Sequence, residues 1–417
     1  FWLRNQMQQF GQGRVFYILP FTASINAMFE RLKNNFGDEK AGMLHGKLND
    51  YLYDYFDEFQ YSISAKKESI DALKNKFKTL ITPVKVVTPF QLLKHIFGLK
   101  GYEQGIFEMV GGYFIFDEIH AYSPEVFAQI KVLLEFATKH LGVKVIVMTA
   151  TMPTFLKKEI EIACGSFTPV KAEKSLYREF KRHQIVLEKG LLFDSLEKIQ
   201  QDLRVYNKKV LVVCNTVQQA QDVYEKLRAY AGKSVLLHSA FNGEDRNANE
   251  NKIKKGEEEN DAKVQLLVGT QAIEVSLEID YDIIYSEAAP IDALIQRFGR
   301  VNRKRKKGVC PVVVFRDSNE NDKYIYNPAI TKKTIEVFDK VILETDGIIE
   351  EERLQDYIDE VYNEWNAKDY EDFKRIYDLL TYGLSQLKPM IHSKESEEDF
   401  YRQFDGIKVL PQSFHEE

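Results

Sequence analysis

The chain has 417 residues, 44% of them hydrophobic, and carries a formal net charge of −6. This length accommodates about two to three domains, and the acidic balance excludes a general attraction for nucleic acid, so that any such site must be local. The three cysteines, Cys164, Cys214 and Cys310, are far apart and lack metal-ligand spacing. They argue against a disulfide framework and favour a reducing, cytoplasmic location.

Apolar runs and the N-terminal stretch lead to two further expectations. No apolar run approaches the 18 residues of a membrane span, and the N-terminal stretch lacks the pattern of a signal peptide. We therefore predict a soluble protein with no membrane partner. The first residue is Phe1 and a strand-like run begins near residue 15, so we expect this chain to be a fragment of a longer protein.

Two series of apolar runs predict the fold. Runs rich in Val, Ile and Phe without polar alternation are typical of strands buried on both faces of a parallel sheet. The first series occupies 15–20, 84–89, 113–118 and 143–151, and amphipathic stretches such as 22–36 and 124–140 lie between these runs. The second series occupies 208–216, 234–239, 264–270, 281–287 and 309–315. This alternation predicts an α/β protein with two lobes.

The same pattern divides the chain into regions. We predict a first lobe over 1–170, a polar crossover near 170–185 and a second lobe over 185–318. The charged helical sequence of 319–417 is predicted to form a third unit, with Trp365 and several tyrosines as core anchors. The segment 253–263 is predicted to be a solvated loop with helix ends.

An acidic pair ends one predicted strand. In "YFIFDEIH", Asp117 and Glu118 follow the apolar run directly, and His120 comes two residues later. Ligands of open α/β sheets gather at the carboxyl ends of the strands, and nucleotide hydrolysis needs a metal and a group that orients water. Asp117 is therefore predicted to bind magnesium and Glu118 to polarise the nucleophile. The alternative is an acidic helix start.

The segment "MTATMP" follows the next predicted strand. Its hydroxyl residues Thr149 and Thr151, which flank Ala150, are expected to exchange hydrogen bonds between the carboxylate site and the neighbouring lobe. Such bonds would couple nucleotide state to movement. A Thr-rich strand end is by itself a weak signal.

A basic segment, "ALIQRFGRVNRKRKKG", spans 293–308. Read as one helix, it would align Arg297, Arg300 and Arg303 on one face toward an anion. The arginine fork suits the charge on a transferring phosphoryl group. The following run of Lys and Arg, residues 304–307, is interpreted as a solvated turn that could equally touch a phosphate backbone.

Together these segments resemble a known family. "DEIH", "TAT", "VGTQAIEVSLEIDYD" and "QRFGRVNRK", in this order across two α/β lobes, resemble motifs II, III, V and VI of superfamily-two DExH helicases. Four further segments are similar to those of the CRISPR-associated Cas3 helicase of type I interference: "YILPFTASINAMFERL", "VVTPFQLL", "LHSAFNGEDR" and "FDGIKVLP". The resemblance covers roughly residues 15–315 and implies two RecA-like lobes.

The resemblance implies an ATP-dependent, magnesium-dependent helicase that moves along single-stranded DNA from 3′ to 5′. Its partners would be a CRISPR surveillance complex and an HD nuclease, fused or separate. Asp117 and Glu118 would be the hydrolytic carboxylates, and His120 would link them to the second lobe. The residues implied to face the nucleotide from the second lobe are Gln296, Arg300 and Arg303, with Asp280, Gly269 and Arg297 near it.

The family also implies a path for single-stranded DNA across both lobes. Hydroxyl and amide side chains suit this path because they bond phosphate oxygens without reading sequence. Any one of them could instead cap a strand end or a helix. The implied contacts are Pro20, Thr22, Thr88, Gln91, Asn215, Thr216, His238, Ser239, Thr270 and Gln271.

One element of such an enzyme has no match in the sequence. A phosphate loop needs Gly, four residues, then Gly-Lys and Ser or Thr between a strand and a helix. "AGMLHGKL" has the wrong spacing and ends in Leu48, and "LRAYAGKS" has Leu227 at the first glycine position. We expect the loop to lie upstream of Phe1 and predict that this chain alone is inactive.

Two alternatives remain open on the sequence. A DExH helicase acting on RNA fits the general motifs, and a non-catalytic scaffold would fit a true loss of the phosphate loop. No paired His-Asp constellation in a helical domain is apparent, so nuclease activity is not predicted. Glu278 stands where the family pattern has Asp, which we expect to alter nucleotide contacts slightly.

Overall fold

The computed structural model describes residues 1–37, 39–48, 51–52, 63–78, 82–259, 263–274, 277–391 and 398. Contacts divide the chain into two compact units. The first unit comprises Phe1–Ala150, Lys158–Phe167 and the described residues from Trp365 onward, and the second comprises Thr151–Lys157 and Thr168–Glu364. Among the described residues, no helix is both long and apolar enough to cross a membrane.

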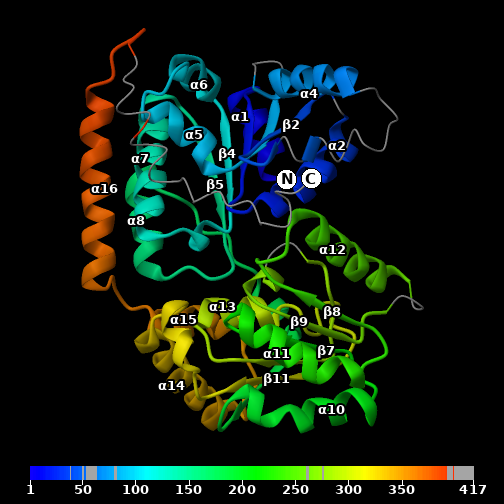
Figure 1. Cartoon of the computed structure of the whole chain (residues 1–417). Coiled ribbons are helices and arrows are strands. Elements are labelled where there is room, and N and C mark those ends of the chain that lie inside the picture. Colours follow the sequence, from blue (N-terminus) through cyan, green and yellow to red (C-terminus); the bar gives the residue numbers. More distant parts are fainter. Residues whose placement is uncertain are drawn as a thin grey trace. The chain divides into compact units, whose positions relative to one another are not determined.

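The first unit is built on a five-stranded parallel sheet with strand order β2-β3-β1-β4-β5 (Figure 1). Its central strands are buried because Val, Ile and Phe side chains meet helices on both faces. The strands are β1 (Val15–Ile18), β2 (Ala41–Leu44), β3 (Val84–Val87), β4 (Tyr113–Asp117) and β5 (Lys144–Met148).

Helices connect these parallel strands. α7 begins where Ser123 accepts a hydrogen bond from the Val126 N–H and Pro124 occupies the first turn. The helices are α1 (Trp2–Phe10), α2 (Thr22–Phe36), α4 (Ile63–Lys78), α5 (Pro89–Ile96), α6 (Tyr102–Met109), α7 (Pro124–His140) and α8 (Thr154–Cys164), whose first turn belongs to the second unit.

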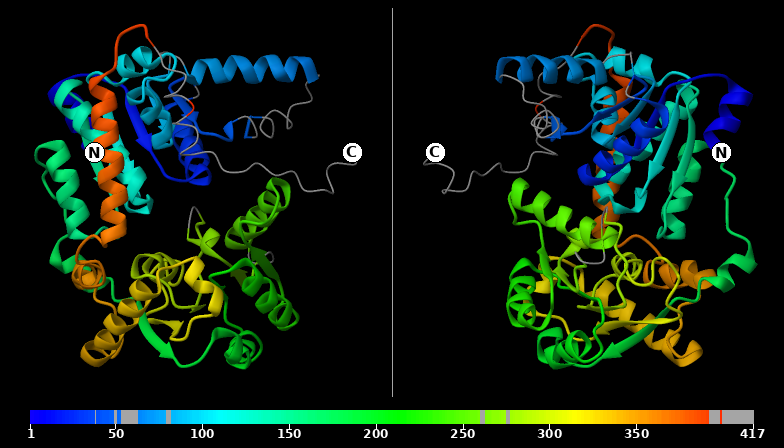
Figure 2. Two further views of the ribbon diagram at one scale, coloured as in Figure 1. Left: turned by 60° about the vertical axis from the view of Figure 1, so that its left-hand side comes forward. Right: turned by 90° about the vertical axis from the view of Figure 1, so that its right-hand side faces the viewer.

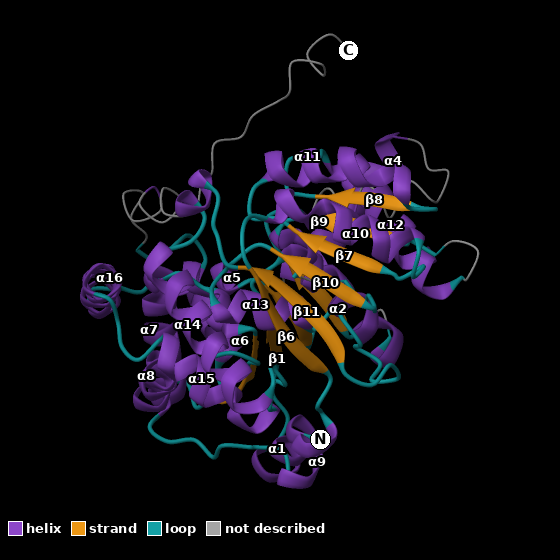
Figure 3. Ribbon diagram, turned by 90° about the horizontal axis from the view of Figure 1, so that it is seen from below, coloured by secondary structure: helices purple, strands orange, loops and turns teal. Residues whose placement is uncertain are grey.

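The second unit contains a six-stranded parallel sheet with strand order β6-β11-β10-β7-β9-β8 (Figure 3). Every residue of β7, β9 and β10 is buried, which explains their unbroken apolar runs. The strands are β6 (His183–Glu188), β7 (Val210–Val213), β8 (Ser234–Leu237), β9 (Leu266–Gly269), β10 (Ile283–Ser286) and β11 (Cys310–Phe315).

The helices of the second unit complete the α/β alternation. They are α9 (Lys174–Glu179), α10 (Leu196–Arg204), α11 (Val217–Leu227), α12 (Gly243–Glu258), α13 (Ile291–Phe298), α14 (Pro328–Thr345) and α15 (Leu354–Val361). The predicted α/β class with two parallel sheets is confirmed. The prediction of a loop at 253–263 was wrong in its first half, because α12 continues to Glu258.

Two strands escaped the sequence analysis. β2, AGML, is a short run with a glycine at its second position, and β6, HQIVLE, begins within the polar stretch interpreted as a crossover and has only three consecutive apolar residues. Both lie at an edge of their sheet. Neither strand has the longer continuous run of Val, Ile and Phe that predicted the other strands.

The region 319–417, predicted as one further unit, is instead divided between the two units. Phe338 and Val341 of α14 belong to the core of the second unit. The last helix, α16 (Ala367–Ser385), packs along α7 of the first unit (Figures 1 and 2). The stretch "FDGIKVLP" at 404–411 lies outside the described residues.

An aromatic cluster joins α16 to α7. The Phe373 ring lies 4.9 Å from that of Trp365 and 6.1 Å from that of Phe127 on α7. The Tyr377 hydroxyl donates to Glu135 at 2.8 Å, and the Lys131 ammonium lies 4.6 Å from the Tyr377 ring centroid. Trp365 is therefore a packing anchor, as predicted, but it packs within the first unit and not in a separate third unit.

This packing predicts a local effect for Phe373→Ala. Removing a buried Phe costs about 3–5 kcal/mol, so native-state hydrogen exchange should show faster exchange along α7 while the amides of β7 keep their protection. Leu379→Ala on the same helix is the control, because Leu379 is 55% exposed. Equal loss of protection in β7 would contradict the assignment of α16 to the first unit.

Candidate active site

The acidic pair lies at the carboxyl end of β4. Asp117 is the last residue of the strand, and Glu118 adopts a left-handed backbone conformation with φ of 56°. Its N–H donates to the carbonyl of Met148 on β5 at 3.0 Å. A non-glycine residue in this region costs of order 1–3 kcal/mol and is typical of functional sites.

Two tyrosines that the sequence analysis missed surround Asp117. The Tyr17 hydroxyl of β1 donates to Asp117 Oδ2 at 2.8 Å. Burial, with a further contribution from the Asp117 charge, raises the pKa of Tyr17 and of Tyr122. In the sheet register Tyr17 lies beside Ile115, two residues before Asp117. The period of two along strands would have placed Tyr17 and Asp117 on one face, had the pairing of β1 with β4 been known.

His120 connects the acidic segment to the end of β5. Its Nδ1 lies 2.6 Å from the Thr149 hydroxyl and 3.5 Å from Glu118 Oε2. Thr149 was predicted to bond toward the neighbouring lobe. Its hydrogen bond with His120 instead lies within the first unit, where it joins the ends of two neighbouring strands. Ala150 is exposed, and Thr151, assigned to the second unit, has a buried hydroxyl with no hydrogen-bond partner in the described part of the chain.

The donor set at this strand end fits magnesium. Mg²⁺ prefers oxygen ligands and is usually held by one or two carboxylates together with waters and substrate phosphates. Asp117 and Glu118 offer that chemistry. Across the described ranges, no group of three or more His, Cys, Asp or Glu side chains could form a metal cage. A metal here would therefore depend on the phosphates of a nucleotide.

Arg297 in the second unit corrects one prediction. Its side chain is fully buried, with Nε 2.8 Å from Glu274 and the other nitrogens bonded to Asn215, Ser286 and Tyr326. Moreover α13 ends at Phe298, so no helix face aligns the three arginines. The Arg297 guanidinium is committed to the interior and presents no surface to a nucleotide in this structure.

The other two arginines are held in the turns after α13. The Arg300 guanidinium donates to the carbonyl of Leu277, at 2.7 Å, and to that of Glu274. The Arg303 N–H donates to Asp280 at 2.8 Å, while the Arg303 side chain is exposed. Asp280 thus orients the turn that presents Arg303. The pair Arg297–Glu274 supports the same region from inside.

Further predicted residues divide by exposure. Gln296 is half-buried on α13. Gly269 ends β9, and a Cβ there would lie 2.4 Å from the carbonyl oxygen of Leu237, so close strand packing requires its glycine. In the basic turn, Lys307 is engaged with Asp282 at 2.7 Å, and Arg305 lies over the Phe180 ring at 4.2 Å.

The predicted nucleic-acid contacts lie just beyond the carboxyl ends of neighbouring strands within each unit. Four of them have side chains at most 6% exposed, which present little surface to a phosphate in this structure: Thr88, Asn215, His238 and Thr270. Ser239 is exposed. The half-buried members are Pro20, Thr22, Gln91, Thr216 and Gln271. Thr216 accepts a hydrogen bond from the Gln219 N–H as the cap of α11.

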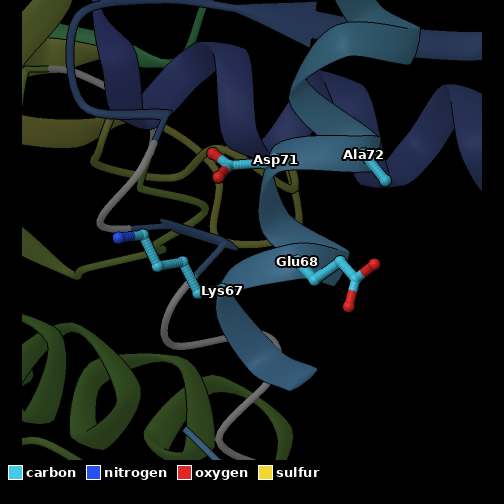
Figure 4. Close-up of a pocket in the computed structure, with 4 residues that line it drawn as sticks. All are labelled: Lys67, Glu68, Asp71 and Ala72. Atoms are coloured by element: carbon cyan, nitrogen blue, oxygen red, sulfur yellow. The ribbon is translucent and has the colours of Figure 1, made fainter. Parts of the chain in front are cut away.

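A surface pocket elsewhere in the first unit contains none of these residues. It is lined by Lys67, Glu68, Asp71 and Ala72, all exposed on α4 (Figure 4). The side chains of Glu68 and Asp71 point in different directions. The pocket offers no convergent set of polar groups and does not extend the candidate active site.

A buried carboxylate joins the Arg297 network. Glu287, 3% exposed, accepts hydrogen bonds from the Asn215 N–H at 2.6 Å and from the Asn319 amide at 2.7 Å. Burial is the main cause that raises the pKa of Glu287 to about 7, although the Asn215 N–H and Arg297 oppose the shift. The Glu287 side chain therefore fixes the position of Asn215, which in turn contacts Arg297.

The raised pKa predicts how stability depends on pH. Between pH 5 and 7 the folded state keeps a proton on Glu287 that the unfolded state has lost, so this group stabilises at low pH and loses that effect as the pH rises through 7. Glu287→Gln should reduce the fall in unfolding free energy between pH 5 and 7 by about 2 kcal/mol. Urea unfolding at both pH values measures this. Glu278→Gln, at an exposed position, should leave the fall unchanged.

Comparison with known proteins shows which families the two units resemble. Residues 2–158 match the DEAD/DEAH box helicase family, and residues 206–306 match the C-terminal part of CRISPR-associated nuclease/helicase Cas3. The chain is similar over its whole length, at 26% identity, to a putative CRISPR-associated nuclease/helicase Cas3 of Methanocaldococcus jannaschii and covers 58% of that protein. It spans about half the length of the curated relatives it matches.

Solved structures share the fold. The crystal structure of T. fusca Cas3-AMPPNP matches 93% of this chain with a TM-score of 0.72 at 19% identity, and the chain covers 53% of that protein. A chain in the structure described as a CRISPR RNA-guided surveillance complex, pre-nicking, matches 93% of this chain with a TM-score of 0.65 at 18% identity, and 50% of it is covered. In its matched helicase segments, its full-length likeness and its fold, the chain is similar to the CRISPR-associated DEAD/DEAH box helicases of the Cas3 family.

Proposed function

We propose that this chain supplies the motor part of an ATP-dependent translocase and helicase that acts on single-stranded DNA in CRISPR type I interference in the cytoplasm. The observation that carries the proposal is the bonded arrangement at the carboxyl ends of β4 and β5. There Asp117, Glu118, His120 and Thr149 meet, with Glu118 in a left-handed conformation. By resemblance, movement would run from 3′ to 5′.

Each member of this arrangement has a separate role. Asp117, oriented by the Tyr17 hydroxyl, would hold magnesium, which when bound neutralises charge on the phosphates. Glu118 orients the attacking water and takes up its proton. His120 lies against both Glu118 and Thr149, so it transmits a change at the carboxylates to the end of β5.

The second unit supplies positive charge. Arg300 and Arg303 are proposed to stabilise the charge that develops on the transferring phosphoryl group, which is the role of arginine in many nucleotide hydrolases. Arg297, buried against Glu274, positions these residues and contacts no substrate. The exposed side chain of Arg303 is available for this role.

Contacts with the DNA strand are proposed for the six residues that keep side-chain surface. Their hydroxyl, amide and apolar groups bind backbone without reading bases. They are Pro20, Thr22, Gln91, Thr216, Ser239 and Gln271. Similarity to Cas3 proteins supports DNA as the strand, a CRISPR surveillance complex as the partner, and an HD nuclease, fused or separate, as the source of cleavage.

The lack of a phosphate-loop sequence favours a second candidate, a helicase-like scaffold that binds nucleic acid without catalysis. The retained chemistry favours the motor, because a scaffold does not need Asp117, Glu118, Arg300 and Arg303 together. The two candidates differ in whether ATP hydrolysis depends on Glu118.

The decisive variant is Glu118→Gln. It is made in the longest form of the protein that hydrolyses ATP when single-stranded DNA is present. Removing a general base lowers kcat by about 100-fold or more, while the affinity for ATP should change little because the side chain keeps its size. Steady-state ATPase kinetics measure both. Glu125→Gln, in the first turn of α7, is the matched control. Unchanged turnover in Glu118→Gln would remove the proposed role.

The 417-residue chain itself should hydrolyse ATP little above the buffer rate, with or without single-stranded DNA. The physical reason is that no segment of its sequence offers the backbone N–H cradle and lysine of a phosphate loop. A phosphate-release assay measures the rate. Robust, DNA-stimulated hydrolysis by this chain would show that another segment binds the phosphates.

A further inference from the structure

The loop after β8 contains an aromatic pair, of which the sequence analysis named His238 but not Phe241. The rings of His238 and Phe241 are stacked, with centroids 4.2 Å apart and planes 6° apart. His238 is 3% exposed and its Nε2 lies 3.4 Å from the Gln221 side-chain amide. The Phe241 ring therefore rests on a fixed partner on one face, and part of its surface remains in solvent.

The place of this pair in the sheet links it to the proposed DNA contacts. β8 pairs with β9 and β9 with β7, in a register that brings Leu237, Gly269 and Val213 side by side. Ser239, Gln271 and Thr216 follow these strand ends by two or three residues. The Phe241 ring therefore lies on the loop that begins at the edge bearing the polar side chains proposed to bond phosphate.

The charges near the loop indicate which part of a nucleic acid Phe241 would meet. The first turn of α12 contains Glu244 and Asp245, and Arg246 is paired with Glu250 at 2.9 Å. These groups give phosphate little net attraction. An aromatic face, by contrast, stacks with any base and needs no charge. The loop suits a nucleobase better than a phosphate.

We propose that Phe241, supported by His238, is a base-stacking platform for single-stranded DNA. This inference rests on the proposed function, because it assumes that the strand follows this edge of the second unit. Phe241 would account for binding without sequence preference, since every base has an aromatic face. His238 acts beneath Phe241 as a positioning residue. This supporting role explains why a buried histidine occupies the end of the strand.

The test is the affinity of the full chain for a fluorescein-labelled oligothymidylate of about 16 nucleotides, the upper site size of such binders, measured by anisotropy. Phe241→Ala should weaken binding by about five-fold or more, because stacking on one aromatic ring has that effect. Phe241→Tyr should bind as the parent does. Phe241→Leu, which still packs on His238, should bind as weakly as Phe241→Ala and guards against loss of the fold.

Two further measurements separate stacking from other roles. The slope of log affinity against log salt should be unchanged in Phe241→Ala, because no phosphate contact is removed. A fully abasic oligonucleotide of the same length should bind the parent as weakly as oligothymidylate binds Phe241→Ala. The Phe241→Ala variant should bind the abasic strand with the same affinity as the parent does. Tyr324→Ala, at a 76% exposed aromatic position of the same unit, should match the parent.

The outcomes distinguish this inference from the proposed function. Binding by the parent with no loss in Phe241→Ala, or an equal loss on abasic DNA, would overturn the platform and leave the motor standing. A parent chain that binds no single-stranded DNA would overturn both. A reduced salt slope in Phe241→Ala would assign the loop to the phosphate backbone and also overturn the platform.

Discussion

The constraint on which the candidate sites depend is the parallel direction of all strands in each sheet. Parallel strands end at the same edge, so the residues that follow them are brought together however far apart they lie in the chain. In the first unit this places Glu118 beside Met148 and His120 beside Thr149. In the second it gathers the segments after β7, β8 and β9. An antiparallel strand in either sheet would send its segment to the other edge.

The acidic segment shows how this edge is stabilised. Asp117 continues β4 and pairs beside Met148, whereas Glu118 leaves the strand in a strained conformation. Hydrogen bonds from Glu118 to β5 and from Tyr17 to Asp117 hold the strained turn. The surrounding sheet thereby maintains a backbone geometry that the local sequence alone would not prefer.

In the second unit, buried charged groups hold the segments that follow the strands in place. Arg297 pairs with Glu274 and reaches Asn215, while the carbonyl of Glu274 accepts from Arg300. One interior guanidinium thus connects the segments after β7 and β9 with α13. A buried guanidinium without its carboxylate would be strongly unfavourable, so these segments are constrained to one arrangement.

Much of this protein could be predicted from the sequence alone. Arg300 and Arg303 were predicted on a helix face and instead lie in the turns after α13, but apolar runs without alternation revealed nine of the described strands, and the end of one run placed Asp117 and Glu118 at a strand end. These inferences succeed because buried parallel strands and strand-end chemistry leave local patterns. β2 and β6 were missed because their apolar runs are short.

Only the tertiary structure decided which polar residues remain accessible. The sequence cannot distinguish the buried Arg297 from the exposed Arg303, nor the buried His238 from the exposed Ser239, because burial depends on partners distant in the chain. The end of α13 at Phe298, the hydrogen bond from Tyr17 to Asp117 and the packing of α16 on α7 are likewise decided by long-range contacts. Local patterns determine which elements form, and the packing of those elements determines what each side chain can touch.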